Sequence, residues 1–361
     1  MKITMVSCQH FTSGIGHYGV ELASEIRKTQ PDLELFKLSK PGHEDDSWFS
    51  NSWIRPIRYR SLRNLHPYVL PIYIRKALVG THSDIYHAHW FQSGLALTLG
   101  YSKKTVITMH DVSLLHVKEG SSLFADYYSW SINRFKKLGI PLIVVSEAAK
   151  QDTIEYAGYP EKLVFPIHNG INFNQFYPAK NKINKSTFTL IYTGGLGQRK
   201  NVKKLLDVMK VLENKYDFIE MKLAGSHPER TPFPSYAAQL GLKRTSFTGF
   251  IPDDQLTTFY QNGDLLIYPS EYEGFGFAPL EAMACGIPVI SGTGGALKET
   301  AGSGAWLSGL ETEELAEKAI KIIEDSQFRN DLIKKGSDWV KQFTWEKSAE
   351  KTLDVFQKER S

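Results

Sequence analysis

The stretch Glu273-Gly-Phe-Gly-Phe-Ala-Pro-Leu-Glu281 places two carboxylates on either side of a glycine-rich turn. The strand-like run Asp264-Leu-Leu-Ile-Tyr-Pro-Ser270 precedes this turn, and a helix-like run follows it. Gly274 and Gly276 allow the backbone to approach a ligand closely, and the first turn of a helix offers free N–H groups to an anion. We therefore expect the two glutamates to bind hydroxyl groups on the two sides of a bound phosphate, as a nucleotide-sugar would present them.

The same stretch resembles a known signature. It is similar to the E-x7-E motif of the retaining GT-B glycosyltransferases, specifically glycosyltransferase family 4, and the similarity runs from Pro269 to Val289. The resemblance implies an α/β, GT-B architecture in which two doubly wound Rossmann-like domains face each other across a cleft. It also implies that Glu273 orients the sugar and that Glu281 holds the ribose. The donor-binding residues implied here are Gly274, Phe275, Gly276, Phe277, Leu280 and Glu281. An acidic loop that only caps a helix is the alternative.

The composition describes a globular protein with two domains. A chain of 361 residues is too long for one ordinary core and suits two domains of roughly 150 to 200 residues. Apolar residues make up 42% and charged residues 23%, and no long apolar run predicts a membrane span. The first residues read as a strand rather than a signal peptide. Because Cys8 and Cys285 are the only cysteines, we expect a cytoplasmic location and two buried thiols.

Strand-like and helix-like segments alternate along both halves of the chain, which predicts parallel sheets wrapped by helices. The predicted strands are 2–7, 33–38, 85–89, 105–110 and 142–146, then 188–193, 221–224, 246–249, 265–268 and 289–291, and the predicted helices include 17–29, 201–214, 311–325 and 327–343. We expect an N-terminal acceptor-side domain at 1–175, a C-terminal donor-binding domain at 176–343, and a linker near 174–185. The GT-B resemblance implies that the last helix, about 344–361, returns to the N-terminal domain.

A glycine-rich loop also follows the predicted strand 188–193. The run Gly194-Gly195-Leu-Gly-Gln-Arg199-Lys200-Asn201 opens a helix, and glycines followed by cations at a helix start suit a pyrophosphate. The loop resembles the family's Gly-x-Leu-x-Pro-Arg-Lys-Asn, whose basic pair holds the diphosphate. Gly195 stands where many relatives carry an arginine, so which of Arg199 and Lys200 does the main work stays open. A solvated helix start is the alternative.

Two further loops are expected to complete the donor pocket. Gly225 and Ser226 follow a predicted strand with small residues, and Phe250-Ile251 lies in a loop that resembles the one whose backbone recognises the base in this family. The Arg-Lys-Asn and Phe-Gly-Phe-Ala-Pro-Leu-Glu-Ala-Met runs resemble those of mannosyltransferase-like members. We therefore favour GDP-mannose over a UDP-sugar as the donor.

The run Gly14-Ile-Gly16-His17-Tyr-Gly19 contains a literal G-x-G-x-x-G before a predicted helix. One interpretation is a nicotinamide-dependent oxidoreductase. Two observations argue against this interpretation. The first glycine does not follow the strand directly, and the next strand ends in Lys37-Leu-Ser39, without a carboxylate to bind a ribose. The resemblance implies instead that this loop, with Gly16, closes over the donor phosphate and shapes the acceptor pocket.

Histidines gather near the ends of two predicted strands. Thr108-Met-His110-Asp111 resembles the family's Thr-x-His-Asp, whose histidine lies near the hydroxymethyl group and the reaction centre of the transferred sugar. His87 and His89 share one face of a strand, so a metal site of the hydrolase type and ordinary hydrogen-bonded histidines are alternatives. We expect no metal, because no further His, Asp and Glu cluster completes a ligand set.

No residue is an obvious nucleophile. The resemblance implies transfer of a hexose, mannose or glucose, with retention, through attack of the acceptor hydroxyl on the face that the diphosphate leaves. The expected catalytic residues are His110, Arg199, Lys200 and Glu273, and no cofactor is expected beside the nucleotide-sugar. A non-catalytic sugar binder on a GT-B scaffold is the remaining alternative.

The segment Trp48–Lys76 is basic and aromatic, although the net charge of the chain is only +4. No acidic residue occurs between Asp46 and Asp84. This pattern fits an anionic membrane surface, an anionic acceptor or an ordinary solvated face. No nucleic-acid-binding motif accompanies it. A peripheral position at the inner membrane face is therefore a hypothesis. The acceptor (a glycan, a lipid-linked sugar or a small molecule) and the oligomeric state stay open.

Overall fold

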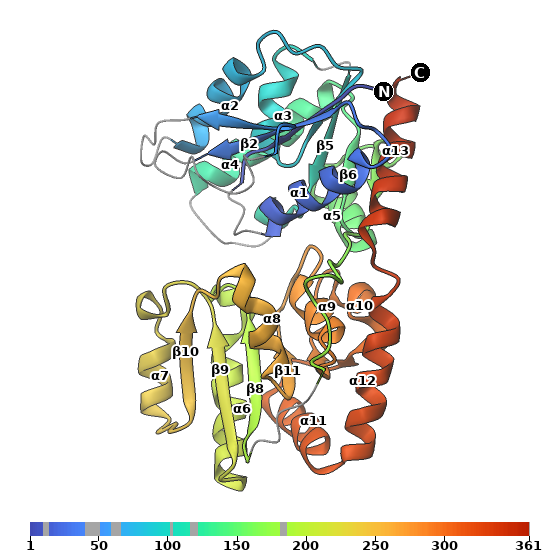
Figure 1. The fold of residues 1–361 in the computed structure, drawn as a ribbon. Coiled ribbons are helices and arrows are strands. Elements are labelled where there is room, and N and C mark those ends of the chain that lie inside the picture. Colours follow the sequence, from blue (N-terminus) through green and yellow to red (C-terminus); the bar gives the residue numbers. More distant parts are fainter. Residues whose placement is uncertain are drawn as a thin grey trace. The chain divides into compact units, whose positions relative to one another are not determined.

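The computed structural model of the chain describes residues 1–9, 14–39, 51–58, 66–101, 104–115, 122–180 and 186–360. The chain divides into two compact units, of which unit 1 is Met1–Gly170 with Thr344–Ser361 and unit 2 is Ile171–Phe343. Each unit is a sheet with helices around it (Figure 1). The chain enters unit 2 after Gly170, before the stretch 174–185 in which the sequence predicts the linker.

Unit 1 is built on a parallel sheet of seven strands in the order β3-β2-β1-β4-β5-β6-β7. The strands are β1 (Ile3–Ser7), β2 (Leu33–Ser39), β3 (Ile54–Arg58), β4 (Ile85–Ala88), β5 (Thr105–Met109), β6 (Leu142–Val144) and β7 (Val164–Pro166). The sequence does not predict the two outer strands, β3 and β7. Each is short and contains a proline, Pro56 or Pro166, which is tolerated at a sheet edge because one side of the strand needs no ladder hydrogen bonds.

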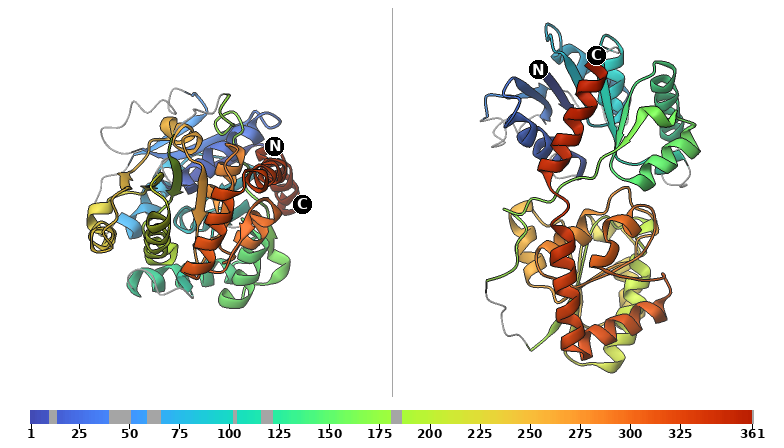
Figure 2. Two further views of the ribbon diagram at one scale, coloured as in Figure 1. Left: turned by 90° about the horizontal axis from the view of Figure 1, so that it is seen from below. Right: turned by 90° about the vertical axis from the view of Figure 1, so that its right-hand side faces the viewer.

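Helices pack on both faces of this sheet. The helices are α1 (Gly14–Arg27), α2 (His66–Ala77), α3 (Phe91–Thr98), α4 (Ser122–Lys137), α5 (Glu147–Ala157) and α13 (Trp345–Arg360), with short 3-10 turns η4 (Ser113–Leu115) and η5 (Glu161–Leu163). Strand β4 shows the two faces, since Tyr86 and Ala88 join the apolar cluster formed with α2, α3 and α4. His87 points the other way, and its ring lies 5.2 Å from that of Phe356 on α13. The C-terminal helix α13 contacts α1 within unit 1 (Figure 2).

Unit 2 has a parallel sheet of six strands in the order β10-β9-β8-β11-β12-β13. The strands are β8 (Phe188–Thr193), β9 (Ile219–Ala224), β10 (Thr245–Gly249), β11 (Leu265–Tyr268), β12 (Val289–Ser291) and β13 (Trp306–Leu307). The helices are α6 (Val202–Lys215), α7 (Phe233–Gln239), α8 (Asp253–Gln261), α9 (Phe277–Ala284), α10 (Leu297–Thr300), α11 (Thr312–Glu324) and α12 (Ser326–Val340), with turns η6 (Gln198–Lys200), η7 (Pro228–Arg230) and η8 (Gly302–Gly304). The prediction of two doubly wound parallel sheets is therefore confirmed.

The strand order of each sheet reverses at one point, and in unit 2 the loops at that point carry the predicted donor motifs. The reversal lies between β1 and β4 in unit 1 and between β8 and β11 in unit 2. In open parallel sheets the loops after the strands diverge at such a point and leave room for a ligand. In unit 2 the run 194–200 follows β8 and Glu273 follows β11, so both donor motifs meet there.

The glycine run at 14–19 is helical, which corrects the expectation of a loop before a helix at His17. Helix α1 begins at Gly14, so Gly16 lies in its first turn. Position 19 requires glycine, because a Cβ there would lie 2.5 Å from Nδ1 of His89. Gly19 thus allows α1 to pack closely on the sheet.

The basic and aromatic segment is only partly described, since Trp48, Phe49, Tyr59, Arg60 and Arg63 lie outside the described residues. The described part of the segment includes side chains that are buried or paired within unit 1. Ile54 and Ile57 of β3 are buried, and Arg55 pairs with Glu34 at 3.1 Å. Trp53 lies under the guanidinium of Arg27, 5.3 Å from the ring centroid. Over the described ranges, no helix combines the length and the apolar character needed to cross a membrane.

Candidate active site

The two predicted cations lie on the 3-10 turn η6, which is fastened to the loop after β11. The backbone N–H of Glu271 donates to the carbonyl of Arg199 at 2.8 Å, and the side-chain amide of Asn201 donates to the carbonyl of Pro269 at 3.1 Å. Asn201 adopts a left-handed conformation with φ of 52° and leads into α6. These bonds fix Arg199 and Lys200 at the carboxyl ends of β8 and β11.

The carboxylate of Glu273 is shared by the two cations. It forms an ion pair with Lys200 and lies 3.4 Å from Nη1 of Arg199, which also donates to the carbonyl of Tyr272. The side chains of Glu273, Lys200 and Arg199 are 9%, 11% and 22% exposed. Burial by itself raises the pKa of Glu273, but the charges of Lys200 and Arg199 outweigh it and hold that pKa below its usual value. Glu273 is therefore ionised at neutral pH.

A glycine-rich loop after β12 holds the backbone of Glu273. The N–H of Ala296 donates to the carbonyl of Glu273 at 2.8 Å, and Glu273 forms an isolated bridge with Gly295. A Cβ at Gly294 would lie 1.8 Å from the carbonyl oxygen of Glu271, so only glycine fits at this position. The sequence alone does not assign this loop to the site, although its run Gly292-Thr-Gly-Gly295 after a strand is a signal of close backbone approach.

The second glutamate, Glu281, is held near the end of β8. It lies on α9, which begins after Gly276 in a left-handed conformation with φ of 90°. The hydroxyl of Tyr260 donates to Oε2 of Glu281 at 2.7 Å and lies 2.7 Å from Oγ1 of Thr193. Because the single proton of the Tyr260 hydroxyl goes to Glu281, the Thr193 hydroxyl donates to Tyr260 in turn. Thr193 is the last residue of β8, directly before Gly194.

The remaining loops of the predicted donor pocket follow neighbouring strands. The hydroxyl of Tyr192 donates to the carbonyl of Gly195 at 2.7 Å, and Gly194 has φ of 147°. The N–H of Gly225 donates to the carbonyl of Gly249 at 3.0 Å, and a Cβ at Gly225 would lie 2.7 Å from the carbonyl oxygen of Gly194. The structure thus brings together the ends of β8, β9 and β10.

Other predicted residues of the donor pocket differ in exposure. Ser226 and Phe250 are exposed, whereas Leu280 is fully buried and Phe275 is nearly so. Ile251 and Phe277 are half-buried. Phe250, at 47% exposed, is one of the most exposed aromatic side chains among the described residues of unit 2.

His110 lies in unit 1, directly after β5. Its Nε2 lies 3.1 Å from the carbonyl oxygen of His89, and the ring of Tyr18 meets its ring edge-on at 4.7 Å. A carbonyl oxygen only accepts, so Nε2 carries the proton and Nδ1 is an acceptor. Burial lowers the pKa of His110 to about 3, so the ring is neutral at neutral pH. Asp111, next in sequence, accepts from the backbone and hydroxyl of Ser113.

His87 and His89 are buried beside His110. The Nε2 of His87 lies 2.7 Å from Oγ1 of Thr108, which also bonds the hydroxyl of Tyr18 at 2.8 Å. Burial lowers the pKa of His87 to about 3 and that of His89 well below its usual value. Among the residues that the structure describes, no three or more His, Cys, Asp or Glu side chains are grouped to hold a metal ion.

Tyrosines are the main residues of the site that sequence reasoning misses. Tyr268, Tyr260 and Tyr192 are each less than 5% exposed and contact Glu273, Glu281 and Gly195 through their hydroxyl groups. Tyrosines on a buried strand or on the buried face of a helix are interpreted as core residues, because packing and hydrogen bonding leave the same pattern in a sequence. Only the position of Tyr192 and Tyr268 near strand ends hints at a role.

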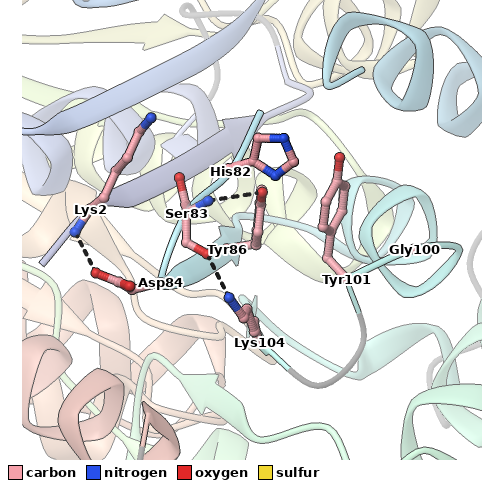
Figure 3. Close-up of a pocket in the computed structure, with 8 residues that line it drawn as sticks. All are labelled: Lys2, His82, Ser83, Asp84, Tyr86, Gly100, Tyr101 and Lys104. Carbon is pink, nitrogen blue, oxygen red and sulfur yellow. Dashed lines mark hydrogen bonds between the residues drawn. The ribbon is translucent and has the colours of Figure 1, made fainter. Parts of the chain in front are cut away.

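A pocket of about 560 Å³ lies in unit 1 at the amino ends of the strands, whereas His110 follows the carboxyl end of β5. Figure 3 shows the residues that line it, which lie around the amino ends of β1, β4 and β5. Its polar groups bind one another: Lys104 donates to the carbonyl of Ser83 at 3.2 Å, and the backbone N–H of Lys2 donates to Asp84 at 2.9 Å. None of the predicted site residues lines this pocket.

Comparisons with known proteins identify the family. Residues 12–175 match the model of Glycosyltransferase Family 4, and residues 173–339 match that of Glycosyl transferases group 1. An O-antigen chain mannosyltransferase B of Escherichia coli is 24% identical over 383 residues, with 95% of this chain and 96% of the relative covered. An uncharacterized glycosyltransferase of Methanocaldococcus jannaschii is 24% identical over 386 residues, with 99% and 98% covered.

Solved structures support the same fold. Sucrose-phosphate synthase from Thermosynechococcus elongatus has a TM-score of 0.83 at 19% identity, with 99% of this chain and 98% of that chain covered. HepE from Anabaena, in complex with UDP and glucose, has a TM-score of 0.80 at 19% identity, with 99% and 100% covered. With two parallel-sheet Rossmann-like units and both family models along its length, the chain belongs to glycosyltransferase family 4 and has the GT-B fold.

Proposed function

We propose that this glycosyltransferase transfers a hexose, mannose or glucose, from a nucleoside diphosphate sugar to a hydroxyl of a glycan, lipid-linked or small-molecule acceptor, with retention of configuration. The observation that carries the proposal is the cluster of Arg199, Lys200 and Glu273 at the carboxyl ends of β8 and β11. It combines two cations with one ionised carboxylate at the reversal point of a parallel sheet. Cations suit a diphosphate, and a carboxylate suits the hydroxyls of a sugar.

In the proposed reaction the chain provides placement and charge. The acceptor oxygen forms a bond to C1 of the sugar on the face from which the diphosphate departs, and the C1–O bond to the diphosphate breaks. The acceptor's proton passes to a phosphate oxygen of the leaving group. Arg199 and Lys200 stabilise the negative charge that develops there, and Glu273 orients the sugar hydroxyls. Because these side chains supply the charge, we propose that transfer needs no metal ion.

The two other predicted groups act on different parts of the substrates. Glu281, held by Tyr260, is proposed to accept from the ribose hydroxyls. The close approach of Gly225 to the carbonyl of Gly194 keeps the loops after β8 and β9 together beside the proposed nucleotide site. His110 is proposed to act as a neutral group, with Nδ1 accepting from a sugar hydroxyl. Since the pKa of His110 is about 3, this role is the same across the range from pH 5 to 8.

The donor favoured by the proposal is GDP-mannose. The mannosyltransferase among the relatives supports mannose, and the Arg199-Lys200-Asn201 run supports the same choice. HepE, whose structure contains UDP and glucose, is the reason to keep UDP-glucose as the competing donor.

The acceptor is proposed to lie at an anionic membrane surface that the segment Trp48–Lys76 contacts. The support is the absence of acidic residues between Asp46 and Asp84. Sedimentation with vesicles of phosphatidylglycerol and phosphatidylcholine tests this proposal. Binding that falls when Arg58, Arg60 and Arg63 are replaced together by serine would support it, and no binding by the wild type would refute it.

A thermal-shift panel with GDP, UDP, ADP, GDP-mannose, UDP-glucose and NADH tests the proposed donor. A ligand at one hundred times its dissociation constant adds about 2.7 kcal/mol of stability. We expect GDP and GDP-mannose to raise the melting temperature and NADH to have no effect. A shift with UDP and UDP-glucose alone would change the donor, and a shift with NADH alone would refute the proposed function.

A further inference from the structure

Tyr268 occupies a central place in the cation cluster. It is the last residue of β11 and is 3% exposed. Its ring stacks on that of Tyr192, with 5.8 Å between centroids and 20° between the planes. Its hydroxyl lies 3.1 Å from Nζ of Lys200 and 3.0 Å from Oε1 of Glu273. One buried hydroxyl therefore contacts both members of the Lys200–Glu273 ion pair.

The directions of these hydrogen bonds follow from the protonation states. Burial, and then the charge of Glu273, raises the pKa of Tyr268 well above its usual value, so the hydroxyl keeps its proton. An ammonium group only donates and an ionised carboxylate only accepts. Lys200 thus donates to the oxygen of Tyr268, and Tyr268 donates to Glu273. The three groups form a closed triangle of one ion pair and two hydrogen bonds.

Such a triangle matters because a lysine is difficult to position. Its ammonium group sits on a flexible four-carbon chain with three rotatable donors, whereas an arginine presents a rigid planar fork. An ion pair with a carboxylate does not by itself fix the orientation of an ammonium group. The hydroxyl of Tyr268 comes instead from the end of a buried strand, and the stack on Tyr192 fixes the ring that carries it.

We propose that Tyr268 is a positioning residue, whose hydroxyl fixes the ammonium of Lys200 relative to Glu273 so that Lys200 meets the leaving diphosphate without rearrangement. This inference rests on the proposed function, in which Lys200 stabilises that diphosphate. The gain appears in the transition state, where the charge develops, rather than in binding of the donor.

The variant Tyr268→Phe tests the proposal, because it keeps the ring and its stack on Tyr192 and removes only the hydroxyl. With GDP-mannose as substrate, we expect kcat for GDP release to fall roughly 10- to 100-fold, the effect of one hydrogen bond to a charged group. We expect KM for GDP-mannose and the dissociation constant of GDP, measured by calorimetry, to change less than about threefold. Unchanged kcat, or a loss confined to KM, would overturn the proposal.

A matched control and a double variant separate positioning from general damage. Tyr216→Phe removes a hydroxyl that donates to Glu324 at 2.6 Å, elsewhere in unit 2, and should leave kcat unchanged. If Tyr268 acts through Lys200, the double variant Tyr268→Phe/Lys200→Ala should be no slower than Lys200→Ala alone. Multiplicative losses in the double variant would show that Tyr268 acts independently of Lys200 and would overturn the proposal.

A readout without turnover distinguishes failure of this inference from failure of the proposed function. The hydroxyl of Tyr268 donates to the ionised form of Glu273, so removing this hydroxyl should raise the pKa of Glu273. Carbon-13 NMR of the Glu273 carboxyl, recorded as a function of pH, measures this pKa. An unchanged pKa would overturn the inference whatever the substrate. A wild type that neither binds GDP or UDP nor cleaves their sugar conjugates would refute the proposed function, and the titration would still decide whether Tyr268 sets the ion pair.

Discussion

The variant Glu273→Gln tests whether the ion-pair cluster holds unit 2 together as well as binding substrate. Glutamine keeps the shape of glutamate and removes its charge. Lys200 and Arg199, which are 11% and 22% exposed, would then lie beside a neutral amide with little access to water. Removing one partner of a buried ion pair costs about 3–5 kcal/mol, and the amide oxygen still accepts one hydrogen bond, so we expect a loss of about 2–3 kcal/mol.

The loss should appear in the melting temperature of unit 2 and should depend on pH. A unit of this size loses about 2–4 °C per kcal/mol, so we expect the transition to fall by about 4–12 °C at pH 7. The folded-state pKa of Glu273 is lowered, mainly because Lys200 and Arg199 outweigh its burial. Its contribution to stability is therefore fully present above the unfolded-state pKa of about 4.3 and is lost as the pH falls through the lower folded-state pKa. The difference between wild type and variant should shrink in that acidic range.

Calorimetric scans at pH 7, and urea titrations at 25 °C between about pH 7 and pH 3.5, measure both effects. The matched control is Glu271→Gln, an exposed glutamate of the same loop, which should leave the transition within about 0.5 kcal/mol of the wild type. A Glu273→Gln protein that is as stable as the wild type at pH 7 would refute the argument from burial and charge. A loss of stability that is the same at every pH would refute the assignment of that loss to the carboxylate.

Three other substitutions follow from the same geometry. Lys200→Ala should lose about 2.7–4 kcal/mol of transition-state stabilisation, by analogy with the loss of an oxyanion donor, and a change in kcat below about tenfold would assign the charge to Arg199. Glu281→Ala should weaken the binding of GDP measured by calorimetry, and unchanged affinity would argue against contact with the ribose. Gly225→Ala should weaken GDP binding and lower the stability of unit 2, because the new methyl group would lie 2.7 Å from the carbonyl oxygen of Gly194; an unaffected variant would show that this contact relaxes at no cost.

The sequence predicts the architecture well because parallel sheets leave a strong local pattern. The strands 188–193, 265–268 and 289–291 are found at the predicted bounds, and others differ by one to two residues at an end. Buried parallel strands are apolar throughout and are bounded by turn residues, so they are visible without tertiary information. The edge strands β3, β7 and β13 are not predicted, because an edge strand needs no long apolar run and, as in β3 and β7, tolerates proline.

The sequence indicates Arg199, Lys200 and Glu273 as candidate site residues, because adjacent cations follow one glycine-rich loop and a glutamate precedes another. The structure brings these three side chains together. Their mutual contact was not predicted, because the ion pair joins loops after two different strands. The helix predicted at 17–29 begins instead at Gly14, because a glycine run predicts a loop unless the close packing of Gly19 on His89 is known.

The sequence by itself determined which chemical groups this protein carries and on which strand ends they stand, because strand periodicity, glycine runs and charge are properties of neighbouring residues. The tertiary structure alone decided that Glu273 is ionised between two cations and that His110 is neutral, since burial and nearby charge set a pKa. It also decided that Tyr268 and Tyr260 hold the two glutamates. These tyrosine hydroxyls bind residues that are brought close only by the tertiary structure, and no pattern of neighbouring residues predicts such contacts.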